Sequence, residues 1–124
     1  VPILSLVTGE GNSGGALGIG VSNKILMLEN AVYSVLSPEG FATILWKDAS
    51  LSGEAAKVMK LTAEDLLRAG VADSVIPEPV GGAQRDPEQL YQSMDRAISQ
   101  ALSSFRGMSP SEIREQRFEK YRAI

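Results

Sequence analysis

Residues 3–20 read ILSLVTGEGNSGGALGIG, an apolar run followed at once by a segment rich in glycine. The run Ile3–Val7 is typical of a strand buried on both faces, as in a parallel sheet. The small residues after it predict a tight turn and then a short helix from Gly14 to about Val21. Because the first amides of a helix have no partner inside it, such a junction can hold an anion or stabilise an oxyanion.

The glycine-rich turn by itself leaves its role open. Gly9–Gly14 fits G-x-G-x-x-G, but no acidic residue stands at the end of a second strand, so a dinucleotide site is disfavoured. No Lys-Ser or Lys-Thr follows the glycines, which excludes a Walker A loop. The structural alternative is a turn whose glycines allow a helix and a strand to pack closely. The pattern does not choose between this alternative and an anion site.

The composition limits the possible chemistry. The chain has 124 residues, 44% hydrophobic and 22% charged, which is typical of one globular domain. Its net charge of −3 disfavours nucleic-acid binding through a broad basic face. The chain has no Cys and no His, so it lacks the usual metal ligands and the usual general base. Chemistry must therefore come from backbone dipoles, carboxylates, hydroxyls, Lys or Arg.

Two features bear on context. The chain begins with Val1 and enters a buried-type strand at once, with few other strand candidates to pair with it. We therefore expect a C-terminal part of a longer polypeptide, with a processed or engineered chain as the alternative. No long apolar run or signal peptide is visible, so a cytoplasmic location is the default expectation.

Alternating short elements follow the glycine-rich segment. Strands are expected at 24–28, 31–36 and 73–76. Ser37, Pro38 and Glu39 suit the start of a helix that runs to about Trp46, as N-cap, first helical residue and acidic first-turn residue. Further helices are predicted at 53–60 and from the capping box at 62–65 to the C-cap glycine at 70.

Two longer helices end the chain. The first begins at Asp86 or Pro87 and stops at Gly107, and the second begins at Ser109. The apolar face of the first helix packs on the body or on a partner subunit in the simplest interpretation. The residues of that face are Leu90, Met94, Ala97, Ile98, Ala101, Leu102 and Phe105.

Several linked segments resemble one family, the α subunits of bacterial-type acetyl-CoA carboxylase carboxyltransferase. The resemblance runs in order along essentially the whole chain. The segments that carry it are residues 1–17 (VPILSLVTGEGNSGGAL), 33–40 (YSVLSPEG), 44–47 (ILWK) and 73–83 (DSVIPEPVGGA). Because the family's subunit is longer, this chain would be its C-terminal portion.

The resemblance implies an α/β fold of the crotonase type, in which ββα units stack into a spiral. Residues 1–83 would form the C-terminal part of that core. Residues 84–124 would form a terminal helical extension that packs on the body or on a partner.

The resemblance also implies a reaction. The family enzyme transfers a carboxyl group from carboxybiotin, held on a biotin carboxyl carrier protein, to acetyl-CoA and so forms malonyl-CoA for fatty acid biosynthesis. The implied partner is a zinc-binding β subunit in an α2β2 assembly, where the β half handles the thioester and this half handles biotin and holds no metal. The implied location is the cytoplasm, or the plastid stroma for a plant-type source.

Gly14 and Gly15 match the diglycine at the helix start of the family, so the resemblance assigns their amides to the ureido oxygen of biotin. Ser37 and Glu39 are candidates for the biotin pocket, although a helix start explains both of them. In a different register, Gly11, Asn12 or Ala16 would contribute to the oxyanion site instead. These three residues and Ser13 are the remaining candidates for the cofactor site.

Two other functions stay open on the sequence alone. One is a different crotonase-type acyl-CoA enzyme, such as a hydratase, isomerase or hydrolase. Those enzymes often place a carboxylate shortly after the glycines, where this chain has Ala16, Leu17, Gly18 and Ile19. The other is a non-catalytic interaction fragment held by its terminal helices.

Overall fold

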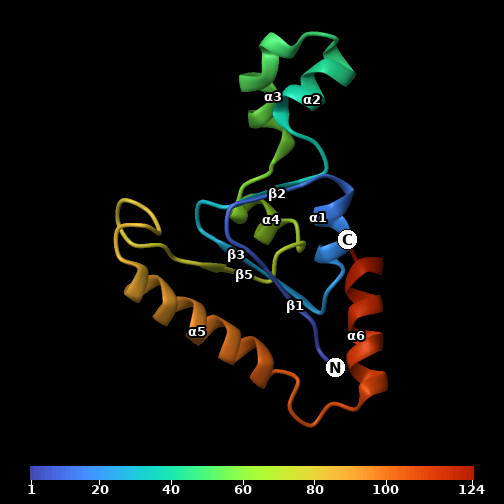
Figure 1. The fold of residues 1–124 in the computed structure, drawn as a ribbon. Coiled ribbons are helices and arrows are strands. Elements are labelled where there is room, and N and C mark those ends of the chain that lie inside the picture. The colour runs from blue at the N-terminus through green and yellow to red at the C-terminus, as the bar shows by residue number, and fades with distance from the viewer.

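The computed structural model describes residues 1–124 and contains two parallel sheets (Figure 1). One sheet has the strand order β1-β3-β5, formed by β1 (Leu4–Val7), β3 (Lys24–Leu28) and β5 (Ser74–Ile76). The other sheet pairs β2 (Glu10–Asn12) with β4 (Val32–Ser34). Every strand pair is parallel, so consecutive strands of one sheet are joined by a crossover rather than by a hairpin.

The element order repeats as strand, strand, helix. The strands β1 and β2 lead into α1 (Ser13–Gly20), and β3 and β4 lead into the next helices before β5 returns to the first sheet. The first strand of each unit joins one sheet and the second strand joins the other. This arrangement confirms the expected α/β spiral of ββα units.

The second unit carries a helical projection that Figure 1 shows pointing away from both sheets. It consists of α2 (Pro38–Phe41), the π-helix η1 (Ala42–Trp46), the 3-10 helix η2 (Ala49–Leu51) and α3 (Ser52–Met59). The chain then returns to the body through α4 (Ala63–Arg68). The predicted helix from Pro38 to Trp46 is therefore present, but its second half has π rather than α geometry.

The core lies around the central strand β3, whose residues Ile25 to Leu28 are almost completely buried. The helix α5 (Pro87–Ser103) joins this core through Leu90 and Ala101, and Met94 and Ile98 pack against it. The expected contact of α5 with the body is confirmed for these positions. Leu102 differs, because the residue is 46% exposed. It lies one residue beyond Ala101, about 100° farther around the helix.

The glycine-rich segment contains a strand that the sequence did not predict. Glu10–Asn12 forms β2, in which Gly11 lies opposite Tyr33 of β4. Glycine has a low strand propensity, so local preference does not indicate a strand here. The strand exists because β4 supplies a partner from a distant part of the chain.

Two glycines of this region are required by one aromatic ring. A Cβ added at Gly11 would lie 2.8 Å from Cδ2 of Tyr33, and a Cβ added at Gly20 would overlap the Tyr33 hydroxyl. The ring of Tyr33 therefore occupies the space that side chains on β2 and at the end of α1 would need. For Gly11 and Gly20 the close-packing interpretation of the glycines is correct.

We expect Gly20→Ala to destabilise the protein by about 1–3 kcal/mol, because overpacking of this kind forces neighbours to shift. A shift of the Tyr33 ring would disturb the hydrogen bond from its hydroxyl to the Ala16 carbonyl at 3.1 Å. Gly18→Ala is the matched control: it lies in the same helix, and a Cβ there meets nothing within 4 Å. Denaturant unfolding of both variants tests this prediction, and equal stabilities would contradict it.

The last helix, α6 (Pro110–Arg122), lies beside α1 and the N-terminus (Figure 1). A capping box fixes its start: the Ser109 hydroxyl accepts from the Glu112 amide at 3.2 Å, and the Glu112 carboxylate accepts from the Ser109 amide at 2.6 Å. The bonds from the Ser109 amide, and then from its hydroxyl, hold the pKa of Glu112 below its ordinary value of 4.5.

A lowered pKa in the folded protein predicts a pH dependence. The contribution of the Glu112 carboxylate to stability is complete above pH 4.5 and is lost as the pH falls through the lower folded-state pKa. Glu112→Gln keeps an acceptor for the Ser109 amide and removes the titration. We expect the variant to lose less stability than the wild type between neutral pH and pH values below 4.5, measured by denaturant unfolding. Identical pH profiles would contradict the prediction.

Candidate functional site

The junction between β2 and α1 has a strained backbone. Ser13 has φ = 69°, in the left-handed region, which costs a residue with a Cβ roughly 1–2 kcal/mol. Neither Gly14 nor Gly15 has a positive φ. Ser13, and not a glycine, therefore takes the left-handed conformation that turns the chain from the strand into the helix.

No side chain caps the start of α1. Its N-cap residue is Asn12, a residue type that often accepts a bond from helix amides, yet it makes no such bond here. The Asn12 Oδ1 atom accepts instead from the Ser34 hydroxyl at 2.9 Å. The side chains of Ser37, Thr62, Asp86 and Ser109 do cap the starts of other helices. The amides at the start of α1 thus remain available to a ligand, with the positive end of the helix dipole behind them.

The two glycines at this helix start have free space around them. A Cβ at Gly14 or at Gly15 would meet nothing within 4 Å, and both residues are exposed. Neither backbone conformation nor packing within residues 1–124 requires glycine at these two positions. The remaining physical reason for glycine at these positions is that a ligand can approach the backbone amides closely.

A cavity of about 440 Å³ lies behind this junction, between β1, β2 and α1. The candidates Gly11, Asn12 and Ala16 line it, together with Thr8 and Glu10. Ser13, Gly14 and Gly15 do not line this cavity and lie exposed at the start of α1.

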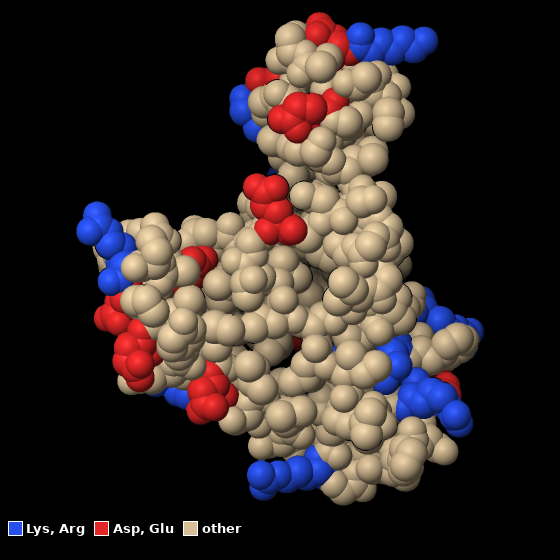
Figure 2. Space-filling view, viewed as in Figure 1, with Lys and Arg blue, Asp and Glu red and all other residues tan.

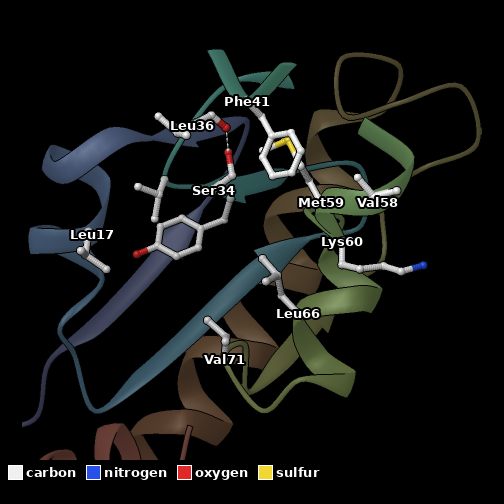
Figure 3. A pocket seen from close by; sticks show the side chains of 11 residues that line it. Leu17, Ser34, Leu36, Phe41, Val58, Met59, Lys60, Leu66 and Val71 are labelled. Atoms are coloured by element: carbon white, nitrogen blue, oxygen red, sulfur yellow. Dashed lines mark hydrogen bonds between the residues drawn. The ribbon is translucent and has the colours of Figure 1, made fainter. Parts of the chain in front are cut away.

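A second cavity, of about 470 Å³, lies on the other side of α1 and is mainly apolar. Figure 3 shows Leu17 of α1 facing it from one side and Val58 and Met59 of α3 from the other. The ammonium group of Lys60 points away from the cavity. The Ser34 Oγ atom at its edge lies 2.5 Å from the carbonyl oxygen of Leu36. This cavity offers an apolar surface next to the helix start.

Ser37 and Glu39 lie on a different element. Both stand at the start of α2 and line neither of the two cavities beside α1. The Ser37 hydroxyl accepts from the amide of Gly40 at 3.1 Å, which is the helix-start role that the sequence indicated. The structure does not place these two residues with the glycine junction.

Tyr33 is a site residue that sequence reasoning missed. It lies between the two cavities and lines both of them, and its hydroxyl donates to the carbonyl of Ala16 at 3.1 Å. Burial, and to a smaller extent the nearby Tyr121, raises the pKa of the Tyr33 hydroxyl, which keeps it protonated as a donor. Nothing local marks Tyr33 in the sequence, because its partners are glycines from 13 to 22 residues earlier.

The charges around the junction do not form one large patch. On the face that Figure 2 shows, Lys and Arg are scattered around the rim together with Asp and Glu. No three Cys, His, Asp or Glu side chains gather in a way that could hold a metal ion. No helix combines the length with the apolar character that a bilayer-spanning segment needs.

Comparison with known sequences assigns the family. The sequence model described as "Acetyl co-enzyme A carboxylase carboxyltransferase-like" matches residues 1–124. The chain belongs to this carboxyltransferase family. The resemblance recognised from the glycine junction and the linked segments is thereby confirmed.

Curated relatives of the chain are named as the α subunit of this carboxyltransferase. The acetyl-coenzyme A carboxylase carboxyl transferase subunit alpha of Staphylococcus epidermidis (strain ATCC 35984) is 52% identical over 124 residues. The protein of the same name from Methylobacterium sp. (strain 4-46) is 50% identical over 123 residues, or 99% of this chain. The chain covers 40% of the first relative and 39% of the second, so it spans less than half the length of the family members it matches.

A solved structure shares the fold. The crystal structure of a Pseudomonas malonate decarboxylase hetero-tetramer in complex with coenzyme A contains a chain that matches with a TM-score of 0.67. The match covers 98% of this chain and 49% of that chain, at 21% sequence identity. The match supports the crotonase-type arrangement of the ββα units. At 21% identity it is evidence of a shared fold and not of a shared function.

Proposed function

We propose that the protein containing this carboxyltransferase-family chain transfers a carboxyl group from carboxybiotin on a carrier protein to acetyl-CoA and forms malonyl-CoA. The chain supplies the biotin side of the site. Family membership supports the reaction class, and one structural observation supports the role of this chain: the open, uncapped start of α1 at Gly14 and Gly15.

The residues at the junction fit a group that carries a developing negative charge on oxygen. The amides of Gly14 and Gly15 lie in the first turn of α1, where the helix dipole favours an anion, and no side chain competes for them. The missing side chains leave room for the oxygen of a ureido ring to approach. Carboxybiotin supplies the carboxyl group that is transferred. The two amides stabilise the charge that develops on the ureido oxygen.

The expected contribution of these amides is large. Removing one preorganised donor from an oxyanion site typically costs about 2.7–4 kcal/mol in the barrier. The strained backbone of Ser13 fits this assignment, because strain of this kind is often retained where it orients a functional group. Gly11, Asn12, Ser13 and Ala16 complete the proposed biotin-binding junction, and their positions around the cavity of about 440 Å³ support that role for Gly11, Asn12 and Ala16.

The remaining parts of the proposal follow from the family. The whole protein would assemble with a zinc-binding β subunit, in an α2β2 arrangement, and would meet a biotin carboxyl carrier protein. Its product would enter fatty acid biosynthesis, in the cytoplasm or in a plastid stroma. Residues 84–124, which include α5 and α6, would be the helical extension of the crotonase-type core in residues 1–83.

We expect Gly15→Val in the full-length subunit to reduce carboxyl transfer by at least a hundredfold, which is what the loss of one donor predicts. The valine side chain would obstruct the approach of the ureido oxygen to the amides. Because this interaction strengthens in the transition state, kcat should fall together with kcat/KM. The acetyl-CoA affinity should stay nearly normal. Malonyl-CoA formation and acetyl-CoA binding are measured separately on the assembled enzyme.

Gly18→Val is the matched control for this prediction. Gly18 lies in the same helix and an added Cβ there is equally open, so both variants make the same chemical change in α1 and alter its helix propensity in the same direction. A similar loss of activity in both variants would show that the helix, and not the Gly15 amide, is affected. Near-normal turnover of Gly15→Val would remove Gly15 from the site. Enoyl-CoA hydration without any carboxyl transfer would favour a different acyl-CoA reaction.

A further inference from the structure

The sequence of α1, which carries the proposed donor amides, has a low helix propensity. Its sequence is SGGALGIG, so four of its eight residues are glycine. Each glycine is about 1 kcal/mol less favourable than alanine in a helix interior. Burial adds little within residues 1–124, because 54% of Leu17 and 74% of Ile19 are exposed and Gly20 alone is buried. Other contacts must hold this helix in place.

Three side-chain hydroxyls from other strands and helices bind the carbonyl groups of α1, and the hydroxyl of Ser22, two residues beyond α1, also lies 3.2 Å from the Gly20 carbonyl oxygen. The Tyr33 hydroxyl donates to the Ala16 carbonyl at 3.1 Å, and the Ser5 hydroxyl donates to the Ile19 carbonyl at 2.7 Å. The Tyr121 hydroxyl donates to the Gly20 carbonyl at 2.5 Å. The carbonyls of Ile19 and Gly20 belong to the last turn, whose carbonyls have no partner inside a helix.

These three hydroxyls come from three different elements. Ser5 lies in β1, Tyr33 in β4 and Tyr121 in α6. Tyr121 also accepts from the Ser22 amide at 3.0 Å, across 99 residues of sequence, and so ties the segment after α1 to the last helix. The hydroxyls therefore fix the position of α1 relative to both sheets and to α6.

The helix α6 is itself firmly attached to this segment. The Asn23 amide group donates to the Ile113 carbonyl and to the Gln116 side chain, each at 2.7 Å. The Arg117 guanidinium donates to Asn23 Oδ1 at 2.9 Å. Asn23 is completely buried, so these bonds form in a protected environment where a lost partner is costly. These bonds hold α6, and with it Tyr121, in place independently of the contact between Tyr121 and α1.

We infer that Ser5, Tyr33 and Tyr121 are positioning residues, which orient α1 so that the amides of Gly14 and Gly15 point at the ureido oxygen. The inference rests on the proposed function. Donors of this kind act only when they are held close to the productive geometry, within roughly 0.5 Å and 10–20°. A helix of eight residues is about 12 Å long, so a tilt at its C-terminal end displaces the donors at its N-terminal end.

Tyr121→Phe tests the inference, because it removes one hydroxyl and keeps the ring. In the full-length subunit assembled with its partner, we expect kcat to fall about three- to tenfold, as the loss of one hydrogen bond predicts. The KM for acetyl-CoA should not change. Backbone amide hydrogen exchange over residues 13–20 should become faster, measured by mass spectrometry on the same sample. The exchange readout does not depend on any activity.

Tyr91→Phe is the matched control. It makes the same chemical change in α5, where 61% of Tyr91 is exposed and its hydroxyl makes no hydrogen bond. We expect this variant to match the wild type in kcat and in exchange. Tyr121→Phe behaving like Tyr91→Phe would overturn the inference, and so would faster exchange over residues 13–20 with an unchanged kcat.

Two further variants keep the test decisive. Should Tyr121→Phe fail to assemble, Ser5→Ala and Tyr33→Phe each remove a different hydroxyl from the same helix, and normal kcat in both would overturn the inference. Failure of the proposed function is recognised separately: the wild-type enzyme would then show no transfer from carboxybiotin. In that case faster exchange over residues 13–20 in Tyr121→Phe would still support the role of the hydroxyl in holding α1, and unchanged exchange would overturn it.

Discussion

The structure around the candidate site depends on the close approach of the Tyr33 ring to two glycines. The ring fills the notch between β2 and the end of α1, where Gly11 and Gly20 leave no side chain in its way. Its hydroxyl reaches the carbonyl of Ala16 in the middle of the helix. One residue of β4 therefore sets the distance between the small sheet and α1, and it separates the two cavities that flank the helix.

The glycines of this region serve two different purposes. Gly11 and Gly20 are needed because an aromatic ring occupies the space of their side chains. A Cβ added at Gly14 or Gly15 would meet nothing within 4 Å, and both residues have no positive φ and stand at a helix start that no side chain caps. In the sequence these glycines belong to one continuous small-residue pattern. Their difference follows from which atoms lie opposite them.

The last helix ties the site to the end of the chain. Lys120 of α6 lies 2.5 Å from the Asp73 carboxylate, and the same carboxylate accepts from the Ile25 amide at 2.7 Å. The Lys120 side chain is almost fully buried, so this ion pair is shielded from solvent more than the surface pairs of α3 and α4 are. The contact joins α6 to β3, next to the segment that follows α1. The terminal helix is therefore bonded both to the central sheet and to the end of the helix that begins at the glycine junction.

The sequence by itself determined the elements whose signals are local. The apolar run at Ile3–Val7, the caps at Ser37 and Ser109 and the apolar face of α5 predicted most helices and strands, because capping and periodicity act over a few residues. The linked segments also indicated the family. Only the tertiary structure decided that Glu10–Asn12 is a strand, that Ser13 rather than a glycine takes the left-handed turn, and that Tyr33 lies against the helix. These features depend on pairing and packing between residues far apart in the chain, and no local pattern encodes such contacts.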